Sequence, residues 1–88
     1  MSDSGRIRRV EGLPHQKIED QALVVVARKR EVHLLNPTAT RIWELLERET
    51  TVDDLVKTLT GEYDVDAATA RKDVEAALAE MRQKGLLA

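Results

Sequence analysis

The chain has 88 residues, of which 42% are hydrophobic and 34% are charged, and its formal net charge at pH 7 is −2. This length allows one domain with a modest core, and the charge balance excludes a global positive field that would attract nucleic acid or anionic lipid. The chain has no cysteine, which excludes a disulfide and a thiolate nucleophile. Its longest apolar run, 22–27, is far below the roughly 20 residues that a membrane span needs. We therefore expect a small cytoplasmic protein.

Residues 1–13 form a polar N-terminal tail, of which we expect residues 1–11 to be frayed, ahead of a folded domain at residues 14–88. Three strand patterns follow the tail, at 15–19, 22–27 and 31–35, and the second is the strongest because it contains Val24, Val25 and Val26. The links between them are short, which favours an antiparallel meander. The second link, Arg28-Lys29-Arg30, lacks the glycine or asparagine that tight hairpin turns prefer.

Three helices are predicted after the strands, because the hydrophobic period changes from that of a strand to that of a helix near Asn36. Each predicted helix has an apolar stripe and a capping residue, and the caps are Asn36 (with Pro37 in the first helical position), Thr51 and Asp66. Gly61 is predicted to end the second helix, and Gly85 the third. The sequence thus predicts an α+β fold, winged-helix-like, with a three-stranded antiparallel sheet followed by three helices.

No catalytic constellation is visible in the sequence. The only histidines, His15 and His33, lie in predicted strands and outside any nucleophile, metal or phosphate-binding motif. The aspartates at the helix starts are accounted for by capping and by the helix dipole. We therefore expect a protein that is not an enzyme, with no metal site and no cofactor.

The third strand, 31–35, is predicted to be an edge strand without the usual protection. Val32 and Leu34 lie on one face and Leu35 on the other, and Glu31 is the one charge that discourages pairing with another strand. Such an edge suits a partner peptide that adds a strand. The alternative is an edge that the protein's own helix covers.

The third helix has two polar flanks beside its apolar stripe. A helical projection places Arg71, Glu75, Leu78 and Arg82 on one flank, and Thr69, Asp73, Glu80 and Lys84 on the other. The first flank has the more groove-like composition, although a solvated helix face is the alternative. The predicted peptide-binding residues are Val32, His33, Leu34, Leu35, Arg71, Glu75, Leu78 and Arg82.

An ordered series of short motifs resembles the PqqD family, over roughly residues 14–87. The motifs are Leu35-Asn36-Pro37, Ala39, Ile42-Trp43, Leu45-Leu46, Thr51-Val52-Asp53-Asp54-Leu55, Tyr63-Asp64-Val65, Asp73-Val74 and Gly85-Leu86-Leu87. Members of this family are small domains, also called RiPP recognition elements, with three strands followed by three helices. The glycine that is common in the family's second hairpin is replaced within Arg28-Lys29-Arg30, and the one after the first helix is replaced near Arg48-Glu49.

The resemblance implies a peptide chaperone. Such a protein binds the leader of a ribosomally made precursor peptide by strand addition and presents it to a modifying enzyme, often a radical SAM enzyme. Whether the pathway makes pyrroloquinoline quinone or another peptide product is left open by the sequence, as are the precursor and the partner enzyme.

Two alternatives compete with this interpretation. A winged-helix DNA-binding domain would use the third helix in the major groove, but residues 67–84 contain four basic and three acidic groups, a weak footprint for phosphate neutralisation. The other alternative is a structural adaptor subunit of an enzyme. We expect no nucleic acid partner and no membrane contact, and the unprotected edge also permits a domain-swapped homodimer.

Overall fold

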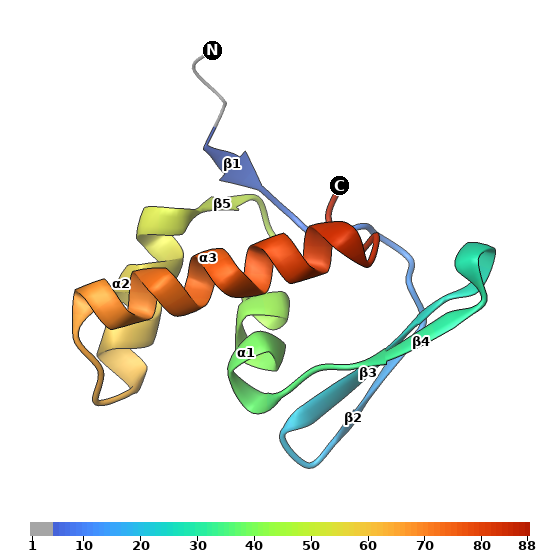
Figure 1. The fold of residues 1–88 in the computed structure, drawn as a ribbon, viewed down its shortest axis with the longest axis horizontal. Coiled ribbons are helices and arrows are strands. Elements are labelled where there is room, and N and C mark those ends of the chain that lie inside the picture. The colour runs from blue at the N-terminus through green and yellow to red at the C-terminus, as the bar shows by residue number, and fades with distance from the viewer. Residues whose placement is uncertain (1–4) are drawn as a thin grey trace.

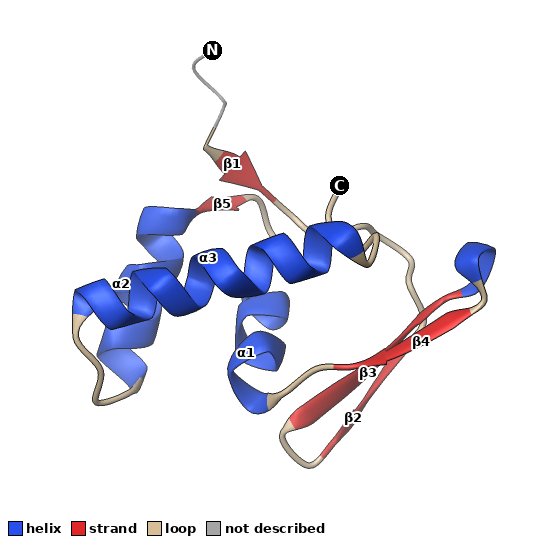
Figure 2. Ribbon diagram, in the orientation of Figure 1, coloured by secondary structure: helices blue, strands red, loops and turns tan. Residues whose placement is uncertain are grey.

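The computed structural model describes residues 5–88, so residues 1–4 of the predicted tail lie outside the described part (Figure 1). One antiparallel sheet has the strand order β2-β3-β4, and three helices follow it (Figure 2). The elements are β2 (His15–Ile18), β3 (Gln21–Val26), β4 (Glu31–Leu34), α1 (Pro37–Leu45), α2 (Val52–Glu62) and α3 (Ala67–Gln83). The predicted α+β fold, with a three-stranded antiparallel sheet followed by three helices, is confirmed. No helix within residues 5–88 is long and apolar enough to cross a bilayer.

The sheet is buried on one face only. The buried side chains of the central strand are Ala22, Val24 and Val26. Because successive side chains of a strand point to opposite faces, the residues between them face away from the core. Val32 pairs with Val25 and Leu34 with Leu23 on that outer face. Val32 and Leu34 are 58% and 54% exposed there, so β4 presents apolar side chains to solvent.

Local capping explains where the helices begin. The side chain of Asn36 accepts a hydrogen bond from the Ala39 N–H at 2.8 Å, and Asp66 caps α3 in the same way through the Thr69 N–H. Thr51 caps α2. The buried face of α3 consists of Ala70, Val74, Ala77, Leu78 and Met81, which pack on the helices and the sheet. The predicted caps are therefore correct.

Two predicted boundaries differ in the structure. Gly61 does not end α2, which continues to Glu62, because the Tyr63 N–H still donates to the Leu59 carbonyl. The link between β3 and β4 is a turn of 3₁₀ helix, η1 (Ala27–Lys29), followed by Arg30 in the left-handed region at φ 56°. This position usually holds glycine or asparagine, because other residues adopt the left-handed conformation only at a modest cost. Since Arg30 occupies it here, the sequence contains no recognisable turn signal.

The expectation of a frayed segment is wrong for residues 6–10. Strand β1 (Arg6–Ile7) pairs with β5 (Thr50–Thr51), and the Arg9 N–H donates to the Leu46 carbonyl at 3.0 Å. The Arg9 guanidinium lies 3.9 Å from the centroid of the Trp43 ring and donates to the Trp43 carbonyl at 3.1 Å. Stacking on an aromatic ring offsets the polar composition that suggested a solvated tail.

Replacing Arg9 with alanine should destabilise the domain by about 1–2 kcal/mol, since a cation–π contact and a hydrogen bond are lost together. The matched control is Arg6→Ala, whose ion pair with Glu49 is more than half exposed on both sides and should cost less than about 0.5 kcal/mol. Urea denaturation measures both variants. Equal small effects would mean that the N-terminal segment contributes nothing to stability.

The Thr40 hydroxyl joins the sheet to the first helix. Thr40 is buried, and its Oγ1 accepts from the Ala22 N–H at 2.9 Å while donating to the Leu35 carbonyl at 3.2 Å. Leu35 N–H in turn donates to the Ala22 carbonyl at 2.8 Å. The hydroxyl therefore stands between an amide and a carbonyl that would otherwise form the last bond of the β3–β4 ladder.

The Thr40→Val substitution should destabilise the protein by about 1–3 kcal/mol, because an isosteric methyl leaves a buried amide and a buried carbonyl without a partner. Thr40→Ser keeps the hydroxyl and should cost clearly less. Chemical denaturation of the two variants tests this order, and a serine variant as unstable as the valine variant would contradict it.

Candidate functional site

The outer edge of β4 is open. Leu35 and Ala22 are hydrogen-bonded partners, and His33 pairs with Val24 two residues earlier. Because hydrogen bonding alternates along an antiparallel pair, the N–H and C=O groups of Val32 and Leu34 point away from β3. Within residues 5–88 no strand pairs with this edge. Two donors and two acceptors are thus available to an added strand.

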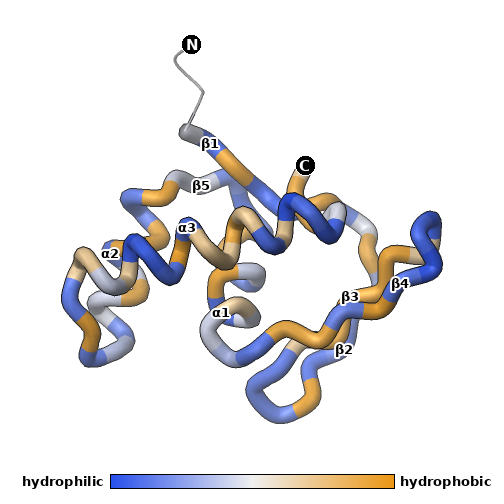
Figure 3. Tube along the Cα trace, in the orientation of Figure 1, coloured by the Kyte–Doolittle hydropathy of each residue, from blue (hydrophilic) through white to orange (hydrophobic). Residues whose placement is uncertain are grey.

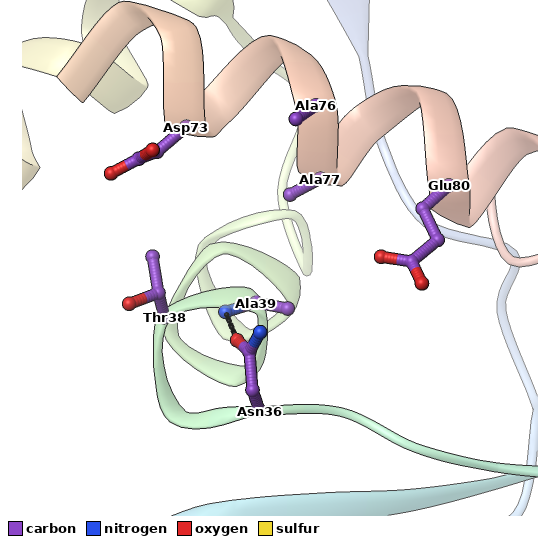
Figure 4. Close-up of a pocket in the computed structure, with 7 residues that line it drawn as sticks. All are labelled: Asn36, Thr38, Ala39, Asp73, Ala76, Ala77 and Glu80. Atoms are coloured by element: carbon purple, nitrogen blue, oxygen red, sulfur yellow. Dashed lines mark hydrogen bonds between the residues drawn. The ribbon is translucent and has the colours of Figure 1, made fainter. Parts of the chain in front are cut away.

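A hollow of about 260 Å³ lies between α3 and the start of α1, directly beyond the end of β4. Its lining residues are Asn36, Thr38, Ala39, Asp73, Ala76, Ala77 and Glu80. Figure 4 shows Asp73 and Glu80 projecting from α3 at the two sides of this hollow, with the small side chains of Ala76 and Ala77 between them. The geometry leaves room for a side chain that enters from the strand edge.

The other end of β4 also meets α3. The Lys29 Nζ in the hairpin tip donates to the Gln83 carbonyl at 3.2 Å, and the Lys29 and Arg28 side chains lie beside Gly85. A second hollow is lined by residues of α3 alone, Ala79, Glu80, Arg82 and Gln83. The tip is strongly hydrophilic in Figure 3.

Both ends of β4 therefore lie close to the same helix. We name the surface between them the β4–α3 groove. It comprises the free edge of β4 and the α3 side chains of the first hollow, Asp73, Ala76, Ala77 and Glu80, and it ends where the hairpin tip meets the Gln83 carbonyl.

The predicted strand residues occupy three different environments. Val32 and Leu34 are exposed on the outer face, whereas Leu35 is buried in the core at 4% exposure. His33 faces inward with its side chain 16% exposed, and its Nε2 lies 3.0 Å from the Glu31 carboxylate. The strand thus offers its backbone edge and the outer pair of apolar side chains, but not Leu35.

The packing of α3 places the predicted helix residues in different environments. Leu78 is a core residue at 5% exposure. Arg71 forms an ion pair with Asp53 at the start of α2, and the hydrogen bond that its guanidinium donates to this carboxylate raises the pKa of the guanidinium. Glu75 is exposed on the same flank, and Arg82 lines the second hollow. A helical projection yields two flanks but does not determine which of them faces α2. The flank with Arg71 and Glu75 was therefore predicted to bind the peptide, rather than the flank with Asp73 and Glu80.

Chemically, the site offers hydrogen bonding and side-chain packing. Within residues 5–88 there is no group of three His, Cys, Asp or Glu side chains that could hold a metal ion. The ionisable groups nearest the edge, Glu31 and His33, are paired with each other. The arrangement suits capture of an extended polypeptide.

Solved structures of similar fold include two that contain a leader peptide. TbiB1 in complex with the TbiA(beta) leader peptide is 25% identical, with a TM-score of 0.82, over 91% of this chain and 93% of that one. A lasso peptide synthetase B1 complexed with its leader peptide is 23% identical, with a TM-score of 0.80, over 93% of this chain and 96% of the other.

A third similar structure is the PqqD truncation of PqqCD from Methylobacterium extorquens, described as a functional, stand-alone RiPP recognition element. It is 22% identical, with a TM-score of 0.76, over 94% of this chain and 88% of that one. No curated protein matches the sequence. The family model for coenzyme PQQ synthesis protein D (PqqD) matches residues 22–87, which is most of the chain. The chain therefore belongs to the PqqD family.

Proposed function

We propose that this protein is a recognition element that binds the leader of a ribosomally made precursor peptide as a fourth strand on β4 and presents it to a modifying enzyme. The observation that carries the proposal is the unpaired edge of β4 beside the first hollow of α3. Two solved relatives of the same fold are complexes with leader peptides, which supports the same class of ligand here.

In strand addition, backbone hydrogen bonds supply most of the affinity and side-chain contacts supply the selectivity. The backbone groups of Val32 and Leu34 bond to any extended peptide, because main-chain groups are common to all sequences. The alternate side chains of the added strand lie either beside the outer apolar pair or over the first α3 hollow. Ordering a flexible leader costs conformational entropy, so we expect dissociation constants in the micromolar to sub-micromolar range.

The β4–α3 groove replaces part of the site predicted from sequence. We retain Val32, His33 and Leu34 in the proposed peptide-binding surface and add Asp73 and Glu80 from the other flank of α3. Arg71, Glu75 and Arg82 lie on the flank that α3 turns toward α2, while Leu35 and Leu78 support the surface from the core.

The modifying enzyme completes the proposed function. The chain itself has a non-catalytic role, and a radical SAM protein or another peptide-modifying enzyme carries out the chemistry. We place the encounter in the cytoplasm, where the precursor is translated. The precursor should be encoded as a short open reading frame beside the genes for this chain and for the modifying enzyme. A synthetic copy of its leader is the probe for the next experiment.

Leu34→Pro should weaken binding of that leader about tenfold or more, because proline removes an amide that faces the free edge. The ladder to β3 keeps its bonds, so circular dichroism should show a folded protein. Leu34→Thr is the matched control, which keeps the amide and should weaken binding much less. Isothermal titration measures all three proteins.

A second control separates edge binding from general damage. His33→Pro removes an amide that bonds to β3 and should lower the thermal midpoint far more than Leu34→Pro does. Unchanged leader affinity in a folded Leu34→Pro variant would rule out strand addition at β4. Saturable binding of duplex DNA, with a steep salt dependence, would instead support the DNA-binding alternative.

A further inference from the structure

The β4–α3 groove is oppositely charged at its two ends. At the α1 end, the carboxylates of Asp73 and Glu80 flank the hollow that α3 forms with Asn36 (Figure 4). At the hairpin tip, the basic groups are Arg28, Lys29 and Arg30. An extended ligand that follows β4 must therefore pass from an acidic environment to a basic one.

Internal ion pairs cancel the acidic end only in part. Asp73 has no ion pair within residues 5–88, whereas Glu80 is paired with Lys84 at 3.1 Å. The N-terminus of α1 contributes about half a positive charge near Asn36, which is less than the full negative charge of Asp73.

The basic end is likewise left available. Arg28 and Arg30 form no ion pair within residues 5–88. Lys29 is directed to the Gln83 carbonyl, and the one nearby carboxylate, Glu31, is engaged with His33. Two guanidinium groups can therefore pair with carboxylates of a ligand, preferably in bidentate geometry.

We infer that the groove selects a peptide strand with a fixed charge order, basic residues first and acidic residues after them. This inference rests on the proposed strand addition and specifies its ligand. Antiparallel pairing is the more stable arrangement, and it places the start of the added strand at the α1 end because β4 runs from the tip toward α1. Arg30 and Asn36 are six positions apart, about 20 Å of extended chain at roughly 3.3 Å per residue. Lysine or arginine should thus precede aspartate or glutamate by about five to seven residues.

The test begins with selection of a random 16-residue peptide display library on the immobilised protein. The most enriched peptide is then synthesised in two forms, as selected and with its basic and acidic residues exchanged. Enriched sequences should share the basic-first order, and the exchanged peptide should bind at least about tenfold more weakly at 50 mM salt. This difference should shrink to about threefold or less at 0.5 M salt, where the Debye length is only a few ångströms.

Charge-reversal variants locate the effect on the groove. The double variant Asp73→Lys with Glu80→Lys should reduce the preference for the selected charge order at least about fivefold. The matched control is Asp64→Lys with Glu75→Lys, which changes the net charge equally but lies outside the groove, and it should keep the preference. All four side chains are exposed, so both variants should remain folded.

The direction of the peptide can be read separately. The protein has no cysteine, so a spin label on a cysteine added at the start of the peptide is the sole labelled site. Amide signals of Asn36, Thr38 and Ala39 should broaden while those of residues 28–30 are spared. The reverse pattern, or equal affinity of the two charge orders, would overturn the inferred polarity and leave peptide recognition intact. Failure of the library to yield any peptide that perturbs β4 would overturn the proposed function itself.

Discussion

The position of the β4 edge depends on a single hydroxyl group. Thr40 reaches back from α1 and occupies the last rung of the β3–β4 ladder, between the Ala22 amide and the Leu35 carbonyl. The side chain of Asn36 caps the N-terminus of α1, and its backbone carbonyl accepts a hydrogen bond from the Thr40 N–H. Since the turn from strand to helix is thus fixed on both sides, β4 cannot rotate without breaking buried hydrogen bonds. The free edge and the α3 hollow are held in one geometry as a result.

An open edge strand is normally a hazard, because it invites pairing with other copies. Here the edge is only four residues long, and its ends are closed by the hairpin tip and by the beginning of α1.

Local signals predicted the elements of this fold well. Caps such as Asn36 and Asp66 act within four residues, and the β-branched run of β3 is equally local. The docking of residues 6–10 could not be foreseen, since Arg9 finds its partner Trp43 at a distance of 34 positions. A pattern within one segment carries no information about such a pair.

The open edge of β4 was predictable from the sequence, but the flank of α3 that lies opposite it was not. Strand order follows from short hairpins, so an unpaired third strand is implied by the sequence alone. Which flank of α3 faces that strand depends on how the helix packs between α1 and α2. The pairing of Arg71 with Asp53 assigns one flank to α2, which leaves the side with Ala76 and Ala77 toward the strand. The small residues were the available signal, because a helix that lines a hollow needs short side chains there.

Selectivity in such a site must come from few contacts. The backbone of β4 offers two donors and two acceptors that do not distinguish one extended peptide from another. The outer pair, Val32 and Leu34, favours any apolar residue, and the alanine-lined hollow limits size more than chemistry. Charge is the property left to set register and direction, because a strand shifted by two residues keeps its face but loses its ionic partners. A groove with opposite charges at its ends therefore supplies information that strand pairing alone lacks.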